Sequence, residues 1–183
     1  MNQQERLRAQ REGGQVRRAH TTPHIGHYDN AQHSFNMLLL LYELHPDPSL
    51  ELSKAIAYHD LAERYMGDIP APALLEYPEI RDGIKQVEKE VAALMGLEIQ
   101  ISDDDKRWLA SLDKLEHWLW CQDQLALGNQ NVRAHIAKLD QIFFDLAKQG
   151  QMPIQVVDFL AKFTWKRGTD GVPESSAAVG SDG

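Results

Sequence analysis

Residues 58–68 of this chain read Tyr-His-Asp-Leu-Ala-Glu-Arg-Tyr-Met-Gly-Asp, and they follow an apolar segment with helical character. His59 and Asp60 are adjacent, so they offer one imidazole and one carboxylate to a single cation. Glu63 comes one helical turn after His59 and can therefore lie on the same side of a helix. Asp68 follows a glycine, where the chain can turn sharply. The stretch predicts part of a hydrolytic metal site, provided that further ligands lie elsewhere in the chain.

The length and composition of the chain predict one globular domain. Its 183 residues can bury a substantial core, and the 43% of hydrophobic residues is ordinary for such a domain. We expect this domain to span residues 1–167. Residues 168–183 are rich in Gly, Ser and Ala and show no period, which predicts a disordered tail.

Charge and apolar pattern exclude several kinds of partner. The net charge of −8 repels polyanions, so we expect no nucleic-acid polymer as a partner. No apolar run approaches the roughly 18 residues that span a bilayer. Residues 1–11 are polar and lack a signal-peptide core, so we expect no membrane partner. The single cysteine, Cys121, cannot form an internal disulfide and fits a reducing compartment, which predicts a cytoplasmic protein.

Helical periodicity dominates the chain, and no segment shows a strand pattern. The predicted fold class is therefore all-α. Residues 15–29 lack a clear period and contain a proline, a glycine and three histidines, so we expect an ordered loop there. Helices are expected over residues 2–12, from 30 to the prolines at 46 and 48, from a Ser49 cap toward 59, over 79–97, from a Ser102 cap to 128, over 131–148 and over 153–165.

Two further polar residues fall on apolar helix faces. His33 shares a face with leucines, and Asp113 lies on a stripe that also carries Glu116. Each has a plain structural interpretation, because His33 can bond to the backbone in the core and Asp113 can pair with a lysine or arginine, as a buried carboxylate must find a partner. With His59 and Asp60 they make a set of two nitrogens and two oxygens on three helices. Such a set suits a divalent Mn, Co, Fe, Ni or Zn ion with open positions for water and substrate.

The order of these ligands resembles the signature of the HD-domain phosphohydrolases, His … His-Asp … Asp. More narrowly, residues 59–63 and 67–72 resemble the HD-x-x-E … GD-[LI]-P-x-P run of the YfbR-like 5′-deoxynucleotidases. Arg18 precedes His33 by fifteen residues, as the substrate arginine of that group does. The similarity extends in order over residues 15–147. The phage dATP triphosphohydrolases called DatZ belong to the same group and are similar in length.

The resemblance implies an HD-domain helical bundle and a role for each residue of the site. Glu63 would orient or deprotonate a water, or protonate the leaving oxygen. Arg18 would clamp a phosphate with its planar fork, and Asp68 would accept a hydrogen bond from the 3′-hydroxyl of the sugar. On the residues alone, Arg18 can also be a surface charge beside Arg17, and Asp68 can cap a turn. The resemblance implies four metal ligands: His33, His59, Asp60 and Asp113.

Two positions depart from the pattern of the group. Ala19 stands where the group has a tryptophan that helps to form the sugar pocket. Gln32 stands where a glutamate usually precedes the first ligand histidine. Selectivity for deoxyribose is therefore not carried over, although His20 could fill the space beside Ala19.

Three functions follow from these observations, and each has a nucleotide as its partner. The first is a 5′-deoxynucleotidase that releases phosphate from deoxynucleoside monophosphates. The second is a DatZ-like triphosphohydrolase of deoxynucleoside triphosphates. The third is a non-catalytic nucleotide-binding HD domain, against which the complete ligand set and Glu63 argue. A triphosphate would need further cations, for which the candidates are Arg17, Lys54, Arg64, Lys85 and Lys89.

Two groups of ring side chains each allow two interpretations. The loop histidines could form a second metal site, or they could face solvent and line the pocket: His20, His24 and His27. The tryptophans predict either a core or an oligomer interface: Trp108, Trp118 and Trp120. Because the helix that carries the tryptophans is expected at the surface, we expect a homo-oligomer.

Overall fold

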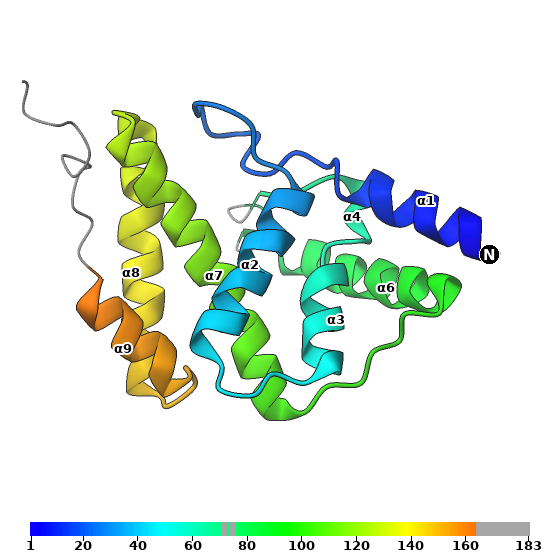
Figure 1. The fold of residues 1–183 in the computed structure, drawn as a ribbon. Helices are drawn as coiled ribbons and strands as arrows, with labels where there is room; N and C mark the ends of the chain where they lie inside the picture. The colour runs from blue at the N-terminus through cyan, green and yellow to red at the C-terminus, as the bar shows by residue number, and fades with distance from the viewer. Residues whose placement is uncertain (71–72, 74–75, 164–183) are drawn as a thin grey trace, which may run out of the picture.

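The computed structural model describes residues 1–70, 73 and 76–163, and within these ranges the chain is all-α, as predicted. An isolated antiparallel bridge joins Arg17 to Asp29. The predicted tail, 168–183, lies outside the described residues. The elements in Figure 1 are α1 (Gln3–Gly13), α2 (Asn30–Leu44), α3 (Leu50–Tyr58), α4 (Glu63–Met66), α6 (Pro78–Met95), α7 (Asp103–Ala126), the 3-10 helix η1 (Gln130–Val132), α8 (Arg133–Lys148) and α9 (Ile154–Lys162).

Polar caps explain where the helices of the site begin. Ser102 caps α7 reciprocally, because its side chain accepts from the third amide of the helix while the third side chain accepts from the amide of Ser102. The side chains of Asp29 and Ser49 likewise accept from amides in the first turns of α2 and α3. These caps set the register of α2 and α7, the helices that carry His33 and Asp113.

The hydrophobic core lies around α7. In Figure 1, α2 lies beside α3 and α7, and α8 packs against α7. Apolar stripes with helical spacing on these helices meet there and exclude water, which is the main source of their stability. The buried core residues include Met37, Leu41, Leu52, Ile56, Leu112, Leu115, Phe143 and Val156.

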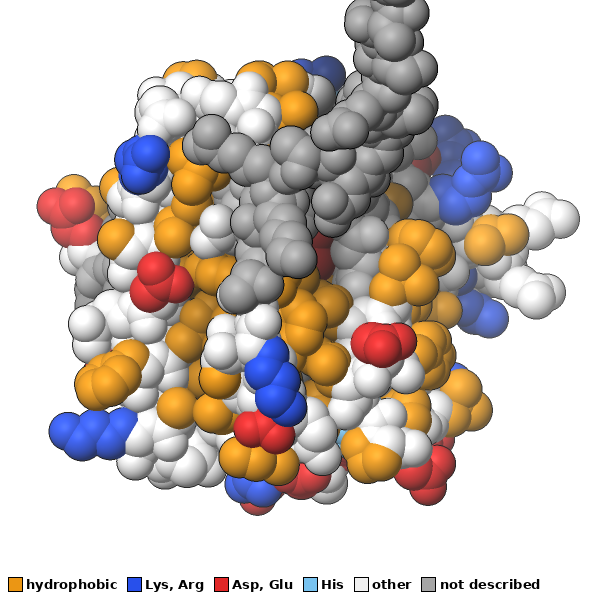
Figure 2. Space-filling model, turned by 60° about the vertical axis from the view of Figure 1, so that its left-hand side comes forward, with side chains coloured by type: hydrophobic (Ala, Val, Ile, Leu, Met, Phe, Trp, Pro, Cys, Tyr) orange, Lys and Arg blue, Asp and Glu red, His pale blue; other side chains and the backbone are white. Residues whose placement is uncertain are grey.

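The tryptophans of α7 lie in the interior, which confirms the first of the two alternatives, a core; the expectation that their helix lies at the surface was wrong. Trp108, Trp118 and Trp120 are no more than 8% exposed, because neighbouring elements cover α7. The homo-oligomer stays a prediction, and it loses this support. Figure 2 shows the side of the molecule on which α8 and α9 lie, where other hydrophobic side chains reach the surface. Phe144 of α8 and Ile154 of α9 are both 64% exposed.

The His-Asp stretch is not one continuous helix. Helix α3 ends at Tyr58, and the next residues form tight turns before α4 begins at Glu63. The amide of Glu63, for example, donates to the Asp60 carbonyl at 3.0 Å, three residues back. The regular helical turn expected between His59 and Glu63 was therefore wrong. Helix α1 packs against this turn so closely that a Cβ on its Gly13 would lie 2.7 Å from a methyl carbon of Leu61.

The loop between α1 and α2 is ordered, and side chains near the end of α7 hold it. The side-chain amide of Gln124 bonds to both the amide and the carbonyl of Ile25, each at 2.8 Å. Asn129 donates to the carbonyl of Pro23 at 2.9 Å. At the start of the loop, the amide of Arg18 donates to the Tyr28 carbonyl at 3.0 Å.

Among the described residues, none of the helices combines the length and the apolar character that crossing a membrane requires.

Candidate metal centre

Three of the predicted ligands converge between α2 and the end of α3. One ligand atom each from His33, His59 and Asp60 lies within 4.8 Å of the others. His33 projects from the first turns of α2, while His59 and Asp60 follow the last residue of α3. Helices α2 and α3 pack against each other, so the two elements bring these groups together across the bundle.

Two ring nitrogens at this place have no hydrogen-bond partner. Nε2 of His33 and Nε2 of His59 are both buried and unsatisfied. Carboxylate oxygens lie near them without hydrogen-bond geometry, at 3.0 Å between His59 and Asp60 and at 3.2 Å between His33 and Asp113. A buried polar atom without a partner destabilises the fold unless something else binds it. Two imidazole nitrogens that face carboxylate oxygens fit a divalent transition ion, which would coordinate both kinds of atom.

Asp113 lies at the edge of the cluster and outside its tightest group. Its Oδ1 is 3.2 Å from Nε2 of His33 and 3.9 Å from Nη2 of Arg18. Its side chain is 37% exposed, so it is reachable from solvent. The alternative for Asp113 was a simple ion pair with a lysine or arginine. The contacts of this kind are long, since Arg18 and Lys114 each lie 3.9 Å from its carboxylate oxygens. The assignment of Asp113 as the fourth ligand stays a prediction.

The charges of the cluster keep its two carboxylates ionised. Burial opposes the anionic form of Asp60, but the attraction of His59 and other neighbours outweighs burial and lowers its pKa to about 2. Burial likewise opposes the charged form of His59, yet Asp60 raises its pKa to about 9, so a metal ion bound by His59 would displace a proton. Burial opposes the anionic form of Asp113 as well, but the attraction of His33 outweighs burial and lowers the pKa of Asp113. Both carboxylates are thus ionised at neutral pH and can ligate a metal ion.

Arg18 reaches into this cluster from the loop. Its Nη1 pairs with Oδ2 of Asp60 and donates to Oδ1 of Asn30 at 3.0 Å. Its side chain is only 13% exposed, which rules out the alternative of a free surface charge. Burial disfavours the charge of Arg18, but the Asp60 carboxylate outweighs burial and raises the pKa of the guanidinium.

Glu63 lies beside the same groups, although the chain reaches it by a turn. Its Oε2 accepts a hydrogen bond from Nδ2 of Asn30 at 2.7 Å. Burial, followed by the charge of Asp60, raises the pKa of Glu63 to about 7. Asn30 therefore bonds both to Arg18 and to Glu63, a role that we did not expect from the sequence. Its position directly after the cap of α2 gave no signal beyond a polar first turn.

Asp68 contacts the loop rather than only its own turn. Its Oδ2 accepts from the amide of Ala19 at 3.0 Å and lies 3.4 Å from Nδ1 of His20. Ala19 has a φ of 51°, which lies in the left-handed region. This backbone conformation is energetically unfavourable for any residue that carries a Cβ atom. The bond to Asp68 holds this conformation directly after Arg18, so Asp68 is more than a turn cap.

The loop histidines do not share a site in the part of the chain that the structure describes. His20 lies near Asp68, as stated above. Nδ1 of His24 lies 2.9 Å from the carbonyl of Thr22, and its ring meets Trp120 edge-on. Nε2 of His27 is 2.8 Å from the carboxylate of Asp29. The geometry therefore favours the second alternative, in which the three histidines are separate side chains and not the ligands of a second metal site.

A buried carboxylate behind His33 was not expected from the sequence as part of the site. Glu116 is 3% exposed, and its Oε2 bonds to Nδ1 of His33. The same oxygen accepts from the Tyr28 hydroxyl at 2.5 Å, and Oε1 accepts from Asn36 at 3.1 Å. Burial opposes its charge, but the hydrogen bond from His33 and further contacts lower the pKa of Glu116. The only signal in the sequence was a second carboxylate on the apolar stripe of Asp113.

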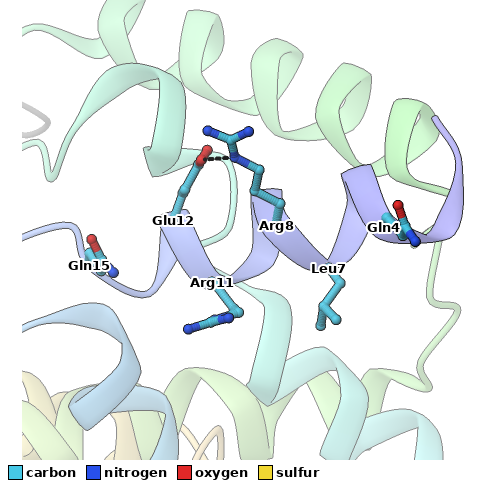
Figure 3. Close-up of a pocket in the computed structure, with 6 residues that line it drawn as sticks. All are labelled: Gln4, Leu7, Arg8, Arg11, Glu12 and Gln15. Carbon is cyan, nitrogen blue, oxygen red and sulfur yellow. Dashed lines mark hydrogen bonds and ion pairs between the residues drawn. The ribbon is translucent and has the colours of Figure 1, made fainter.

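The surface also has a hollow of about 310 Å³ that lies away from this cluster. Figure 3 shows its lining, which comes from α1 and the residues after it, with Arg8 and Glu12 paired at 2.8 Å. None of its lining residues belongs to the predicted site. The lining residues are Gln4, Leu7, Arg8, Arg11, Glu12 and Gln15. We therefore place the candidate centre by its chemistry and not by this hollow.

Comparison with known proteins agrees with the geometry. The family model of the HD domain matches residues 10–116, a range that contains every predicted site residue. A search of curated proteins gave no match. HD domains bind divalent metal ions, and the family consists generally of hydrolases. The match covers more than half of the chain, and the chain therefore belongs to the HD-domain family.

Proposed function

We propose that this protein is a metal-dependent phosphohydrolase of nucleotides, and specifically a 5′-deoxynucleotidase that releases phosphate from deoxynucleoside monophosphates. One observation carries the proposal: the unpartnered nitrogens of His33 and His59 face Asp60, and an arginine stands directly beside them. A cation site next to a guanidinium is an arrangement that suits a phosphate ester, whose oxygens bind both kinds of positive charge.

The side chains fit a divalent transition ion such as Mn, Co, Fe, Ni or Zn. His33, His59, Asp60 and Asp113 would hold it, since imidazole nitrogen together with carboxylate oxygen is a donor set that these metals share. When bound, such an ion supplies Lewis-acid chemistry, because it offsets the charge of the phosphate and lowers the pKa of water.

Arg18 and Glu63 would act on the substrate. The planar guanidinium of Arg18 can give two parallel hydrogen bonds to one phosphate, which also orients the ester. Glu63 titrates near neutral pH, since its pKa is about 7, so it can take a proton from the attacking water or give one to the 5′-oxygen of the leaving nucleoside. Asn30 bonds to both residues and would hold them in a fixed relation.

The sugar would lie toward Asp68 and the Ala19 position. We assign the acceptance of the 3′-hydroxyl hydrogen bond to Asp68, whose side chain is 15% exposed. Oδ2 of Asp68 accepts from the amide of Ala19, which holds this carboxylate beside the loop that carries Arg18. The small side chain of Ala19 would exclude a ribose 2′-hydroxyl less well than a large ring would.

The monophosphate is preferred to the triphosphate on one observation. Arg64, a candidate for binding further phosphates, instead pairs with Glu12 through two nitrogens, at 2.8 Å and 2.6 Å. A DatZ-like triphosphohydrolase would need cations beyond Arg18, since triphosphate carries more charge. The two activities release different products, so a single assay separates them.

The experiment is to incubate the purified protein with Mn²⁺ or Co²⁺ and a panel of deoxynucleoside monophosphates and triphosphates. The expected product is phosphate from monophosphates, only when metal is present, and much less of it from the Glu63→Ala variant. Release of triphosphate would replace the preferred activity by the alternative one. If metal-loaded wild type hydrolyses neither set, the non-catalytic domain is correct and the proposal is wrong.

A further inference from the structure

Glu116 lies where it can control the metal ligand His33. The two carboxylates of α7 are three residues apart and lie on one face of the helix, so both reach the same ring. Asp113 stands 3.2 Å from Nε2, while Glu116 bonds to Nδ1. The imidazole of His33 is fully buried between them, and its two nitrogens meet different acids.

We propose that Glu116 is a positioning residue, which fixes the ring of His33 and holds its proton on Nδ1, so that the Nε2 lone pair faces the metal ion. The inference rests on the metal centre of the proposed function. A neutral imidazole carries one proton and binds a metal through the other nitrogen. Glu116 offers only acceptor oxygens, so it selects the form in which Nδ1 carries the proton.

Neighbouring side chains hold the carboxylate of Glu116 in place. The Tyr28 hydroxyl and the Asn36 amide donate to its two oxygens, so the carboxylate cannot turn away from His33. The ring of Tyr28 is 1% exposed and stacks on Trp120 with centroids 4.5 Å apart. A carboxylate behind a ligand histidine raises the basicity of the ring and fixes its orientation, and loss of such a partner typically weakens metal binding about 10–100-fold.

A purely structural role would look different in two measurements. The first is metal affinity, which a competing chromophoric chelator reports for Zn²⁺ and Co²⁺ without any turnover. The second is the Nδ1 proton of His33 in the Zn²⁺-loaded protein, which gives a low-field proton resonance only while it is bonded and shielded from exchange. Neither readout depends on the identity of the substrate.

The variants are chosen so that loss of the fold does not obscure the result. Glu116→Ala removes the acceptor, and Glu116→Gln keeps one acceptor oxygen and the volume of the side chain. Asp140→Ala is the control. Asp140 lies on α8, and it accepts a hydrogen bond at 2.8 Å from the ring nitrogen of Trp118, which is on the same helix as Glu116. This variant therefore also removes a carboxylate that bonds to a buried ring of α7. Circular dichroism checks that each variant is folded.

We expect Glu116→Ala to bind Zn²⁺ about 10–100-fold more weakly and to lose the Nδ1 resonance. Glu116→Gln should fall between Glu116→Ala and wild type, and Asp140→Ala should match wild type. If Glu116→Ala does not fold, the Gln variant carries the test. Wild-type affinity with an unchanged His33 resonance in folded Glu116→Ala, or wild-type affinity in Glu116→Gln where the Ala variant does not fold, would overturn the inference. If wild type binds no metal at all, the proposed function fails together with it.

Discussion

Replacement of Arg18 by alanine should strengthen metal binding and at the same time weaken turnover. In the structure, the guanidinium of Arg18 pairs with Oδ2 of Asp60, which we assign as a metal ligand. An incoming cation must therefore displace Arg18 from Asp60 and tolerate its positive charge nearby. Removal of the guanidinium relieves both penalties, whereas the phosphate of the substrate loses its clamp.

The size of the effect follows from the displaced contact. A hydrogen bond to a charged group contributes about 1.5–3 kcal/mol to stability. The Arg18 side chain is 13% exposed, so solvent weakens this contact only slightly. Since about 1.4 kcal/mol corresponds to a factor of ten in affinity, Arg18→Ala should bind the metal roughly tenfold to a hundredfold more tightly.

The assay is a calorimetric titration of the metal-free protein with Mn²⁺ or Co²⁺, followed by steady-state kinetics with saturating metal. Arg18→Lys is the matched control, because it keeps the charge but loses the paired donors. It should show metal affinity closer to wild type and a clear loss of turnover. Weaker metal binding by Arg18→Ala would refute the idea that the arginine and the metal compete for Asp60.

Three further outcomes are expected. Glu63→Ala should keep the metal and lose about a hundredfold in turnover; loss of the metal instead would make Glu63 a ligand. Because burial and Asp60 raise the pKa of Glu63 from 4.5 to about 7, metal-free wild type should lose stability relative to Glu63→Gln as the pH rises through that window, and a flat difference in the free energy of unfolding contradicts this. Asp68→Asn should slow 3′-hydroxyl substrates more than 2′,3′-dideoxy ones, and equal slowing removes Asp68 from the sugar site.

The helices could be predicted from the sequence because their signals are local. Ser49 and Ser102 cap α3 and α7 where the sequence places them, and the all-α class follows from helical periodicity. The end of α3 at Tyr58 could not be predicted in this way. The turn after it is packed against Gly13 of α1, a contact between residues that are distant in sequence.

In the site as well, residues with a local sequence signal could be predicted, whereas contacts between residues distant in sequence could not. His33 was recognisable because a histidine on an apolar helix face needs an explanation. The role of Glu116 depends on a partner 83 residues away, so a carboxylate on a stripe gave no indication of which ring it would meet. The tryptophans of α7 failed as surface markers because α2, α3 and α8 all pack against this helix, and periodicity within one helix cannot reveal how many neighbours cover it.

The most direct test of the metal centre is its stoichiometry. Wild type and Asp60→Ala are each loaded with Co²⁺ or Mn²⁺, freed of excess metal, and measured by elemental analysis alongside the protein concentration. We expect one tightly bound ion per chain in wild type and none in Asp60→Ala, because two imidazoles and one carboxylate leave the ion under-coordinated. Full metal occupancy in the folded Asp60→Ala variant would contradict the assignment of the centre.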